Sequence, residues 1–348
     1  MKILFVLNSR IPTKSYDDAD RVMWWLGLQL HGMGHEPIFL VKKDSVCHFG
    51  PVFVLDEKKM LSAQIPEDID LVHFFYRPPA EKFDVEKPYL ITNFENSLEA
   101  ETFDRNTVFL SANHAKRHGG KVFVYPGLHF QEYGAVLLDF PRNYFHFLGD
   151  AAWRGKNVRG AIDLASKAGV RVHIIGGSRV NFRKGLRITL SPSARFHGVL
   201  NSDGRNMMLN GSRGLLFPIL THEPFGLAVP ESLYFGCPVI GTPYGALPEL
   251  ICDYNQAKKQ TANKPKATCT SDVGLLSTKQ TDLLEAIQNT DQFKPERCQE
   301  YALDRFSSVR MAQDYLQLYE KVLNGKPLHA KPPALTEAPD TSFLPLGE

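Results

Sequence analysis

Short apolar runs that alternate with segments of helical pattern constrain the fold of this chain more than any other feature. In the first part of the chain such runs predict strands at 2–7, 35–41, 70–75, 88–94, 107–112 and 121–126. A helix is predicted over 19–34, where Gly34 ends the pattern. Apolar runs separated by helix-length segments are typical of a parallel sheet covered on both faces.

The pattern restarts near residue 144, after a polar, proline-containing stretch at 139–143. Further strands are predicted at 144–149, 171–177, 195–200, 214–219 and 238–243, and helices at 158–169, 206–211, 226–236 and 246–251. A chain of 348 residues is also too long to fold around a single hydrophobic core. We therefore predict an α/β protein of two doubly wound, Rossmann-like domains, 1–140 and 141–308, with a ligand-binding cleft between them.

The C-terminal part carries a long amphipathic pattern from Pro295 to Leu323. It predicts one final helix, of which the last part, about 309–323, packs back on the N-terminal domain. Residues 324–348 hold five prolines and little periodicity, so we expect a disordered tail.

Composition argues against several classes of protein. The 40 basic and 38 acidic residues leave a net charge of +2, whereas a nucleic-acid binder needs a clear cationic excess. The five cysteines are widely spaced without a CxxC pair, which argues against a zinc site and a disulfide framework and favours a reducing compartment. No stretch has the apolar length of a membrane span, and the N-terminal run is short for a signal peptide. We expect a cytoplasmic protein with at most peripheral contact at the inner face of a membrane.

The stretch HEPFGLAVPESLYFGCPVIGTPYGALPEL, residues 222–250, places two glutamates around a predicted helix start. Glu223 precedes the helix, and Glu231 follows about two turns along it. The backbone N–H groups of 225–228 would point into the same space, where Gly226 lets a ligand approach. A ligand with a phosphate and two sugar rings would use each part, with the phosphate on the amides and one ring on each carboxylate. In the structural alternative, Glu223 is a helix-start acid and Glu231 is a solvated helix residue.

This stretch resembles the hallmark of retaining GT-B glycosyltransferases, in particular family 4. The shared pattern is E-P-F-G-L, a second glutamate after seven residues, G-x-P-V-I and G-x-x-x-E-L. The resemblance implies that Glu231 holds the ribose hydroxyls of a nucleotide sugar and that Glu223 lies near the reacting sugar. It further implies contacts of sugar and diphosphate with the amides of Phe225, Gly226, Leu227 and Ala228. Lys156 occupies the position expected to face the diphosphate, and no metal or other cofactor is implied.

Three positions depart from the family pattern. Asp17 and Asp18 replace a glycine pair after the first strand, and one of them could instead cap the following helix. Asp150 stands where a cation is usual, so Arg154 is the candidate second cation beside Lys156. The region 92–96 lacks a usual histidine, which leaves Glu95 or Asn96 to face the acceptor.

Other candidates also have structural alternatives. His73, in an apolar strand at the cleft edge, is either an acceptor-side residue or a buried histidine with satisfied hydrogen bonds. Gly176 and Gly177 resemble a phosphate-binding turn near the nucleotide. The basic run at 116–121 could touch an anionic acceptor or a membrane, or be a solvated loop.

Two functions of different classes follow. In the first, the chain is a metal-independent glycosyltransferase that moves a hexose from a nucleoside diphosphate sugar to a saccharide or lipid-linked acceptor, in polysaccharide or glycolipid synthesis. In the second, it binds nucleotide sugars with little or no transfer and acts as a partner or regulator of another enzyme. A sugar phosphorylase is a weaker third option, because no cofactor-lysine motif is recognisable.

Overall fold

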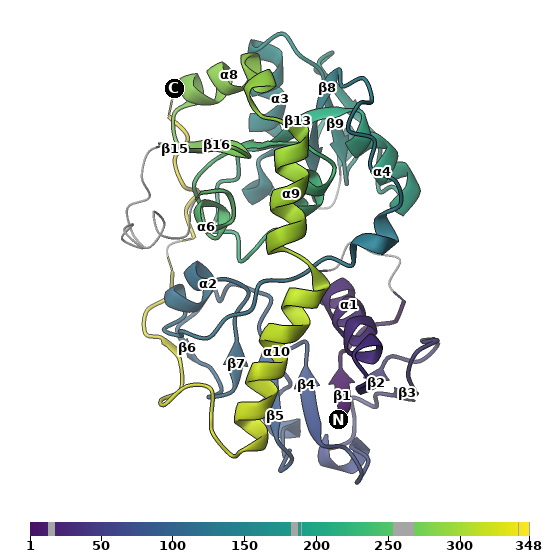
Figure 1. The fold of residues 1–348 in the computed structure, drawn as a ribbon. Coiled ribbons are helices and arrows are strands. Elements are labelled where there is room, and N and C mark those ends of the chain that lie inside the picture. The colour runs from purple at the N-terminus through teal and green to yellow at the C-terminus, as the bar shows by residue number, and fades with distance from the viewer. Residues whose placement is uncertain (13–17, 182–186, 189, 253–267, 340, 348) are drawn as a thin grey trace. The chain divides into compact units, whose positions relative to one another are not determined.

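The computed structural model describes residues 1–12, 18–181, 187–188, 190–252, 268–339 and 341–347. The chain forms two compact units. Unit 1 consists of Met1–His129 and Phe306–Asp340, and unit 2 of Phe130–Arg305 and Thr341–Glu348. The chain therefore passes from one unit to the other at three points along the sequence (Figure 1).

Unit 1 is built on a parallel sheet of six strands in the order β3-β2-β1-β4-β5-β7. The strands are β1 (Lys2–Val6), β2 (Glu36–Val41), β3 (Val52–Val54), β4 (Leu71–Phe74), β5 (Tyr89–Thr92) and β7 (Thr107–Val108). Helices α1 (Asp18–Gly32) and α10 (Ser308–Leu323) pack against each other, α1 on β2 and α10 on β5 (Figure 1). The helix α2 (Ala112–Arg117) follows β7.

Unit 2 has a sheet of seven strands in the order β12-β9-β8-β13-β14-β16-β15, in which only the β15–β16 pair is antiparallel. They are β8 (Tyr144–Leu148), β9 (Val172–Ile175), β12 (Ala194–Phe196), β13 (Ser212–Phe217), β14 (Val239–Gly241), β15 (Thr268–Ser271) and β16 (Gly274–Ser277). A separate pair of short strands, β10 (Val180–Asn181) and β11 (Arg187–Ile188), is antiparallel.

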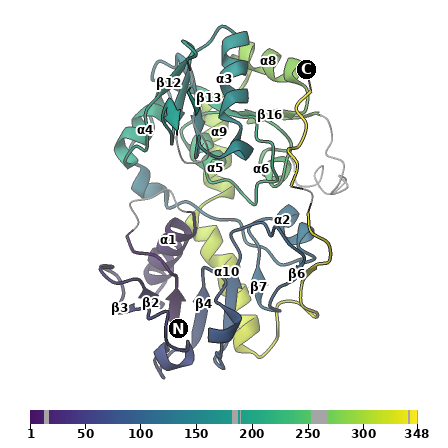
Figure 2. The same ribbon diagram turned by 180° about the vertical axis from the view of Figure 1, so that it is seen from behind.

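Helices cover both faces of this sheet. They are α3 (Val158–Lys167), α4 (Ser202–Asn210), α5 (Ala228–Tyr234), α6 (Leu247–Ile251), α8 (Gln280–Gln288) and α9 (Pro295–Arg305). Phe145 and Phe147 of β8 point into a core with α3 and α8, whereas His146 between them points to α5. The view of Figure 1 has α9 in front, and the reverse view of Figure 2 has α3 in front. The apolar runs are thus buried on two sides, as the sequence predicts for doubly wound sheets.

The long pattern at 295–323 is two helices rather than the predicted one. Between α9 and α10, the backbone of Ser307 is extended, and its side chain accepts a hydrogen bond from the Arg310 N–H. The neighbouring residues 306–308 pair with the backbone of Leu128. Serine is a strong N-cap residue, so it begins a new helix although the apolar spacing continues across the break.

The described part of the C-terminal tail, 324–339 and 341–347, is ordered, which corrects the expectation of disorder there. In unit 1, Ala334–Leu335 forms β17, which pairs antiparallel with β6 (Glu101–Thr102). His329 is buried and hydrogen-bonded to the Thr107 carbonyl over 2.9 Å. Residues 341–347 lie on unit 2. Prolines interrupt the periodic pattern of apolar residues in the sequence. An extended segment can nevertheless pair its backbone with another strand and bury individual side chains.

Three smaller predictions need correction. The run at 121–126 contributes only an isolated bridge, between Phe109 and Phe123, instead of a strand. The boundary expected at residue 140 falls earlier, because the 3₁₀ turn η3 (Phe130–Tyr133) packs on α4 within unit 2. Cys252 and Cys269, expected to be reduced, are paired as a disulfide, which joins the end of α6 to β15.

Candidate functional site

The candidate site lies where the direction of chain winding reverses in the sheet of unit 2. From β8 the chain continues outward through β9 to β12, and from β13 it continues the other way through β14 to β16. The two adjacent strands β8 and β13 therefore send their following loops to opposite sides, and in doubly wound sheets ligands bind at the carboxyl ends of such strands. The loop after β8 carries Arg154 and Lys156, and the loop after β13 carries Glu223.

The loop after β8 is shaped by two residues that suit their positions, Gly155 and Asn157. Arg154–Lys156 forms the 3₁₀ turn η4, and Asn157 then adopts a left-handed conformation with φ of 53°, which asparagine tolerates. Its side chain accepts from the Gly160 N–H at 3.0 Å, so it caps α3, and donates to the Pro218 carbonyl at 2.8 Å. A Cβ on Gly155 would lie 2.7 Å from Thr221 Cγ2, so only glycine allows the two loops to approach.

Lys156 and Glu223 form an ion pair across the two loops. The Lys156 Nζ lies 2.5 Å from Glu223 Oε2, and the side chains are 14% and 6% exposed. The ammonium also lies 5.2 Å from the centre of the Trp153 ring and 5.3 Å from that of Phe217. A cation held against aromatic faces, with little water around it, interacts strongly with any anion that enters.

Two glycines fix the backbone around Glu223. Gly226 has a φ of 88° and Gly245 a φ of 65°, both in the region that favours glycine. A Cβ on Gly245 would lie 2.1 Å from the Glu223 nitrogen, and the Ala246 N–H donates to the Glu223 carbonyl at 2.9 Å. The loop after β14 therefore supports the loop after β13, which explains why the G-x-x-x-E-L pattern begins with glycine at position 245.

Glu231 is placed differently from the sequence-based expectation. Helix α5 begins at Ala228, two residues after the predicted start at residue 226, and Glu231 is 1% exposed. Its Oε1 accepts a hydrogen bond from the Tyr133 hydroxyl at 2.7 Å and lies 3.2 Å from Arg205 Nη1. Glu231 is thus neither solvated nor open to a ligand in this structure. Sequence reasoning missed both partners, because they lie 98 and 26 residues away and carry no motif.

His146 of β8 links helix α5 to the sheet of unit 2. Its ring nitrogens are hydrogen-bonded to Ser212 Oγ at 2.7 Å and Ser232 Oγ at 2.8 Å. Burial lowers the pKa of His146 to about 3, so the ring is neutral at physiological pH. These two hydrogen bonds fix the position of Ser232, one residue after Glu231, relative to the sheet.

The remaining predicted residues of unit 2 occupy neighbouring loops. Arg154 is exposed, so of the two predicted cations only Lys156 faces Glu223. Asp150 turns back on its own loop and accepts from the Ala152 N–H at 2.8 Å. A Cβ on Gly176 would lie 2.3 Å from the Gly149 carbonyl oxygen, and one on Gly177 would lie 2.3 Å from Ala151 Cβ. Close packing of the loops after β8 and β9 thus accounts for both glycines.

In unit 1, His73 corresponds to the structural alternative. It is fully buried, with its Nδ1 2.8 Å from the Tyr319 hydroxyl and its Nε2 2.8 Å from Thr92 Oγ1. The Thr92 hydroxyl is in turn 2.9 Å from the hydroxyl of Tyr315. Burial lowers the pKa of His73 well below its usual range. His73 therefore joins β4 and β5 to α10 and does not face an acceptor.

The loop after β5 is held by the histidines of α2. Glu95 is exposed and Asn96 partly so, and the Glu95 carbonyl lies 3.1 Å from His114 Nε2. His118 Nε2 accepts from the Ser97 N–H at 3.1 Å. His118 is buried within the basic run 116–121, so that run is not a continuous charged surface.

Of the two aspartates after β1, Asp17 lies outside the described residues, and Asp18 stands in the first turn of α1. The buried acid here is Asp20, which was not singled out from the sequence and accepts from Ser9 Oγ at 2.9 Å.

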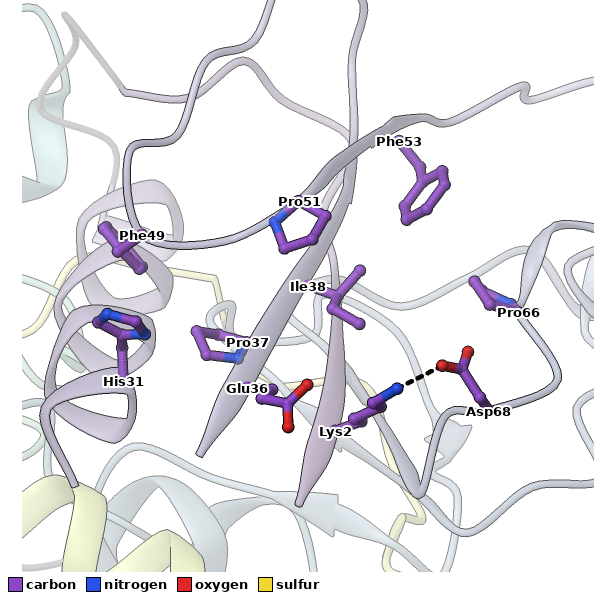
Figure 3. Close-up of a pocket in the computed structure, with 10 residues that line it drawn as sticks. All are labelled: Lys2, His31, Glu36, Pro37, Ile38, Phe49, Pro51, Phe53, Pro66 and Asp68. Carbon is purple, nitrogen blue, oxygen red and sulfur yellow. Dashed lines mark hydrogen bonds and ion pairs between the residues drawn. The ribbon is translucent and has the colours of Figure 1, made fainter. Parts of the chain in front are cut away.

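A cavity of about 330 Å³ in unit 1 lies at the amino ends of β1 and β2, the end of a doubly wound sheet that does not usually bind ligands. Figure 3 shows its apolar floor, which includes Ile38, Pro51 and Phe53, and the Lys2–Asp68 ion pair at its rim.

Comparison with known proteins agrees with this architecture. Residues 144–273, which contain the Lys156–Glu223 pair, match the model of the family described as glycosyl transferases group 1. The whole chain is similar in structure to AviGT4, a glycosyltransferase involved in avilamycin A biosynthesis, with a TM-score of 0.68 at 16% identity, over 93% of this chain and 98% of that one.

The chain has the GT-B fold. Sucrose-phosphate synthase from Thermosynechococcus elongatus gives a TM-score of 0.66 at 14% identity, over 93% of this chain and all of that one. HepE from Anabaena in complex with UDP-glucose gives 0.63 at 15%, again over 93% and 100%. No curated protein sequence matches the chain. Within the part of the chain that the structure describes, no helix is long and apolar enough to cross a membrane.

Proposed function

We propose that the chain transfers a sugar from a nucleoside diphosphate sugar to an acceptor hydroxyl, with retention of configuration. The observation that carries this proposal is the Lys156–Glu223 ion pair, which joins the loops that follow β8 and β13 within the segment that matches the glycosyltransferase model. HepE, which shares the fold, was solved with UDP-glucose. A nucleotide sugar is therefore the ligand class that best fits this site.

In this proposal Lys156 binds the diphosphate and stabilises the negative charge that grows on it as the glycosidic bond breaks. The backbone amides of 225–228 contribute to the same anion, and Arg154, on the exposed side of η4, reaches it from solvent. Glu223 accepts hydrogen bonds from hydroxyls of the transferred sugar once the diphosphate competes with it for Lys156. These cations take the place that a divalent metal fills in other transferases, so we expect no requirement for metal or another cofactor.

Glu231 has a conditional role. In its described position, Tyr133 and Arg205 occupy its Oε1, so contact with ribose hydroxyls requires α5 or these partners to move. We keep Glu231 as the ribose-binding candidate on the strength of the family resemblance.

For the acceptor, we propose a saccharide or lipid-linked sugar in polysaccharide or glycolipid synthesis, at a cytoplasmic location with peripheral membrane contact. Glu95 and Asn96, in the exposed loop after β5, are the candidate acceptor-side residues of unit 1, together with Asp18.

The test is a panel of UDP-, GDP- and ADP-sugars in a thermal-shift assay, followed by transfer and donor hydrolysis with the sugar that binds. Ligand binding to the folded state raises the melting temperature by mass action. Glu223→Gln and Lys156→Ala should abolish most turnover. Lys167→Ala, which removes an exposed lysine of α3 paired with Asp163, is the matched control and should leave turnover unchanged. No shift with any donor of the panel would count against the proposal.

The alternative is a nucleotide-sugar-binding protein without transfer activity. Two observations favour it, namely the sequestered carboxylate of Glu231 and the presence of Asp150 where a cation is usual. Donor binding without hydrolysis or transfer, in a parent protein whose Lys156→Ala variant loses binding, would identify this function.

A further inference from the structure

The last residues of the chain lie directly beside the loops of the candidate site. The Leu344 N–H donates to the Leu220 carbonyl at 2.8 Å, and the Leu220 N–H donates to the Gly155 carbonyl, also at 2.8 Å. Gly155 stands between Arg154 and Lys156, and Leu220 stands three residues before Glu223. Backbone hydrogen bonds therefore join the C-terminal segment to the loop after β13, and that loop to the loop after β8.

A second contact reaches the same site from the loop after β14. The Tyr244 hydroxyl donates to the Pro345 carbonyl. Tyr244 is 2% exposed and precedes Gly245, whose backbone lies against that of Glu223. The Gly245 N–H also donates to His222 Nδ1 at 3.3 Å. The tail thus contacts both loops that fix the backbone of Glu223.

The end of the segment is anchored in the body of unit 2. The Gly347 N–H donates to the Thr278 carbonyl at 2.7 Å, and the Gln280 N–H donates to the Gly347 carbonyl at 2.9 Å. Leu346 packs against the core formed by α3 and α8. Figures 1 and 2 both show the C-terminal end beside α8. An anchored segment can hold the loops that it contacts, whereas a loose one could not.

We propose that residues 342–347 are a positioning segment of the donor site. Leu344 and Pro345 do not touch the ligand but hold Leu220 and Tyr244, so that Glu223 and Lys156 keep their relative position when the diphosphate enters. This proposal rests on the proposed function for its effect on donor binding, but its effect on the site loops can be measured without any ligand.

The physical reason is the entropy of the loop after β13. Residues 218–227 contain no regular element, and an unrestrained loop would lose conformational freedom when a ligand orders it. Hydrogen bonds on both sides of Leu220 restrict the loop before binding. Pre-organisation of this kind raises affinity without adding a contact to the ligand.

Two pairs of substitutions in the full-length chain test the segment. Leu344→Pro removes the N–H that donates to Leu220, whereas Leu344→Ala shortens the side chain and keeps that N–H. Tyr244→Phe removes only the hydroxyl that donates to Pro345. Phe343→Ala, at a side chain that is 51% exposed in the same segment, is its control.

The first measurement is ¹⁹F NMR of protein labelled with fluorotryptophan, without ligand. The chain has three tryptophans, of which Trp153 lies in the loop after β8, and Trp24 and Trp25 lie in α1 of unit 1. The Trp153 resonance should shift or broaden in Leu344→Pro and Tyr244→Phe and stay in place in both controls. The Trp24 and Trp25 resonances should not change in any variant.

The second measurement is the affinity of each variant for UDP, GDP and ADP by calorimetry. For the nucleotide that the parent binds, Leu344→Pro and Tyr244→Phe should weaken binding by roughly three- to tenfold, the range for one lost hydrogen bond. Leu344→Ala should bind like the parent, since the N–H is retained. If the parent binds none of the three, the proposed function fails and the NMR result alone decides about the segment.

An unchanged Trp153 resonance in Leu344→Pro and Tyr244→Phe would overturn the proposal. So would a shifted resonance with unchanged affinity, because the segment would then be structural only. Tighter binding in either variant would also overturn it, since the segment would then obstruct the site instead of positioning it.

Discussion

Replacement of Arg205 by methionine should destabilise unit 2 strongly. Methionine keeps the length of the side chain but leaves Glu231 as a buried carboxylate with one fewer partner. The two side chains are 7% and 2% exposed, with Nη1 and Oε1 3.2 Å apart, so solvent cannot replace the lost charge. Removal of one partner of a buried pair costs about 3–5 kcal/mol. The remaining bond from Tyr133 reduces this penalty, so we expect the lower end of that range.

The assay is urea-induced unfolding followed by the fluorotryptophan signal of Trp153, which reports on unit 2 alone. The control is Lys167→Met, which breaks an exposed pair in which the two side chains are 48% and 47% exposed. Such a pair contributes about 0.2–1 kcal/mol. The double variant Arg205→Met, Glu231→Leu should be more stable than Arg205→Met, because no buried charge is then left alone.

The reasoning would be refuted if Arg205→Met lowered the free energy of unfolding no more than Lys167→Met does. It would also be refuted if Glu231→Leu lowered the free energy of unfolding of the Arg205→Met variant by as much as it lowers that of the parent protein. Either result would mean that water or another group compensates Glu231. The same experiment decides how a binding study of Glu231 is read, since Glu231→Ala leaves Arg205 buried without its carboxylate and can lower nucleotide affinity through stability alone.

Four other outcomes are expected. Lys156→Ala should lower kcat by about 10²-fold, as for one lost oxyanion-type donor, and should change KM less; Arg154→Ala should lower kcat less than Lys156→Ala does. Equal rates in the parent protein and both variants would show that Lys156 does not take part in the reaction. Glu231→Gln, measured where unit 2 is folded, should weaken nucleotide binding by about 1.5–3 kcal/mol in calorimetry, and unchanged affinity would exclude the ribose contact. Transfer should persist in EDTA, and a loss restored by manganese would contradict metal independence. Because the pKa of His146 falls to about 3 in the folded state, from about 6.5 when unfolded, the unfolded chain binds more protons between these values. Its contribution to stability is complete above pH 6.5 and is lost as the pH falls towards 3, so His146→Gln should flatten this part of a urea-unfolding pH profile.

The fold was readable from the sequence because its signals are local. Strand-length apolar runs and helix-length segments set the order of elements, and β8, β9, β13 and β14 lie where the runs predict them. The sequence also placed Lys156 and Glu223 in loops that follow two predicted strands, and the family resemblance implied that both belong to one site. The structure pairs them because adjacent parallel strands bring their following loops together. The break at Ser307 was not readable, because the apolar spacing runs through it while backbone pairing with Leu128 interrupts the helix.

The sequence by itself determined that the chain winds two parallel sheets and places Glu223 and Lys156 in loops that follow strands. Both carboxylates are buried, and only the tertiary structure decided which groups each of them meets. Glu231 carries the same motif signal as Glu223, yet Arg205 and Tyr133 enclose it from distant parts of the chain. Likewise, His73 became a buried link to Tyr319, and the proline-rich end found hydrogen-bond partners in the Leu220 carbonyl and the Tyr244 hydroxyl. Periodicity records which side of an element is buried, but not which distant side chain meets it there, because that pairing depends on how the elements pack.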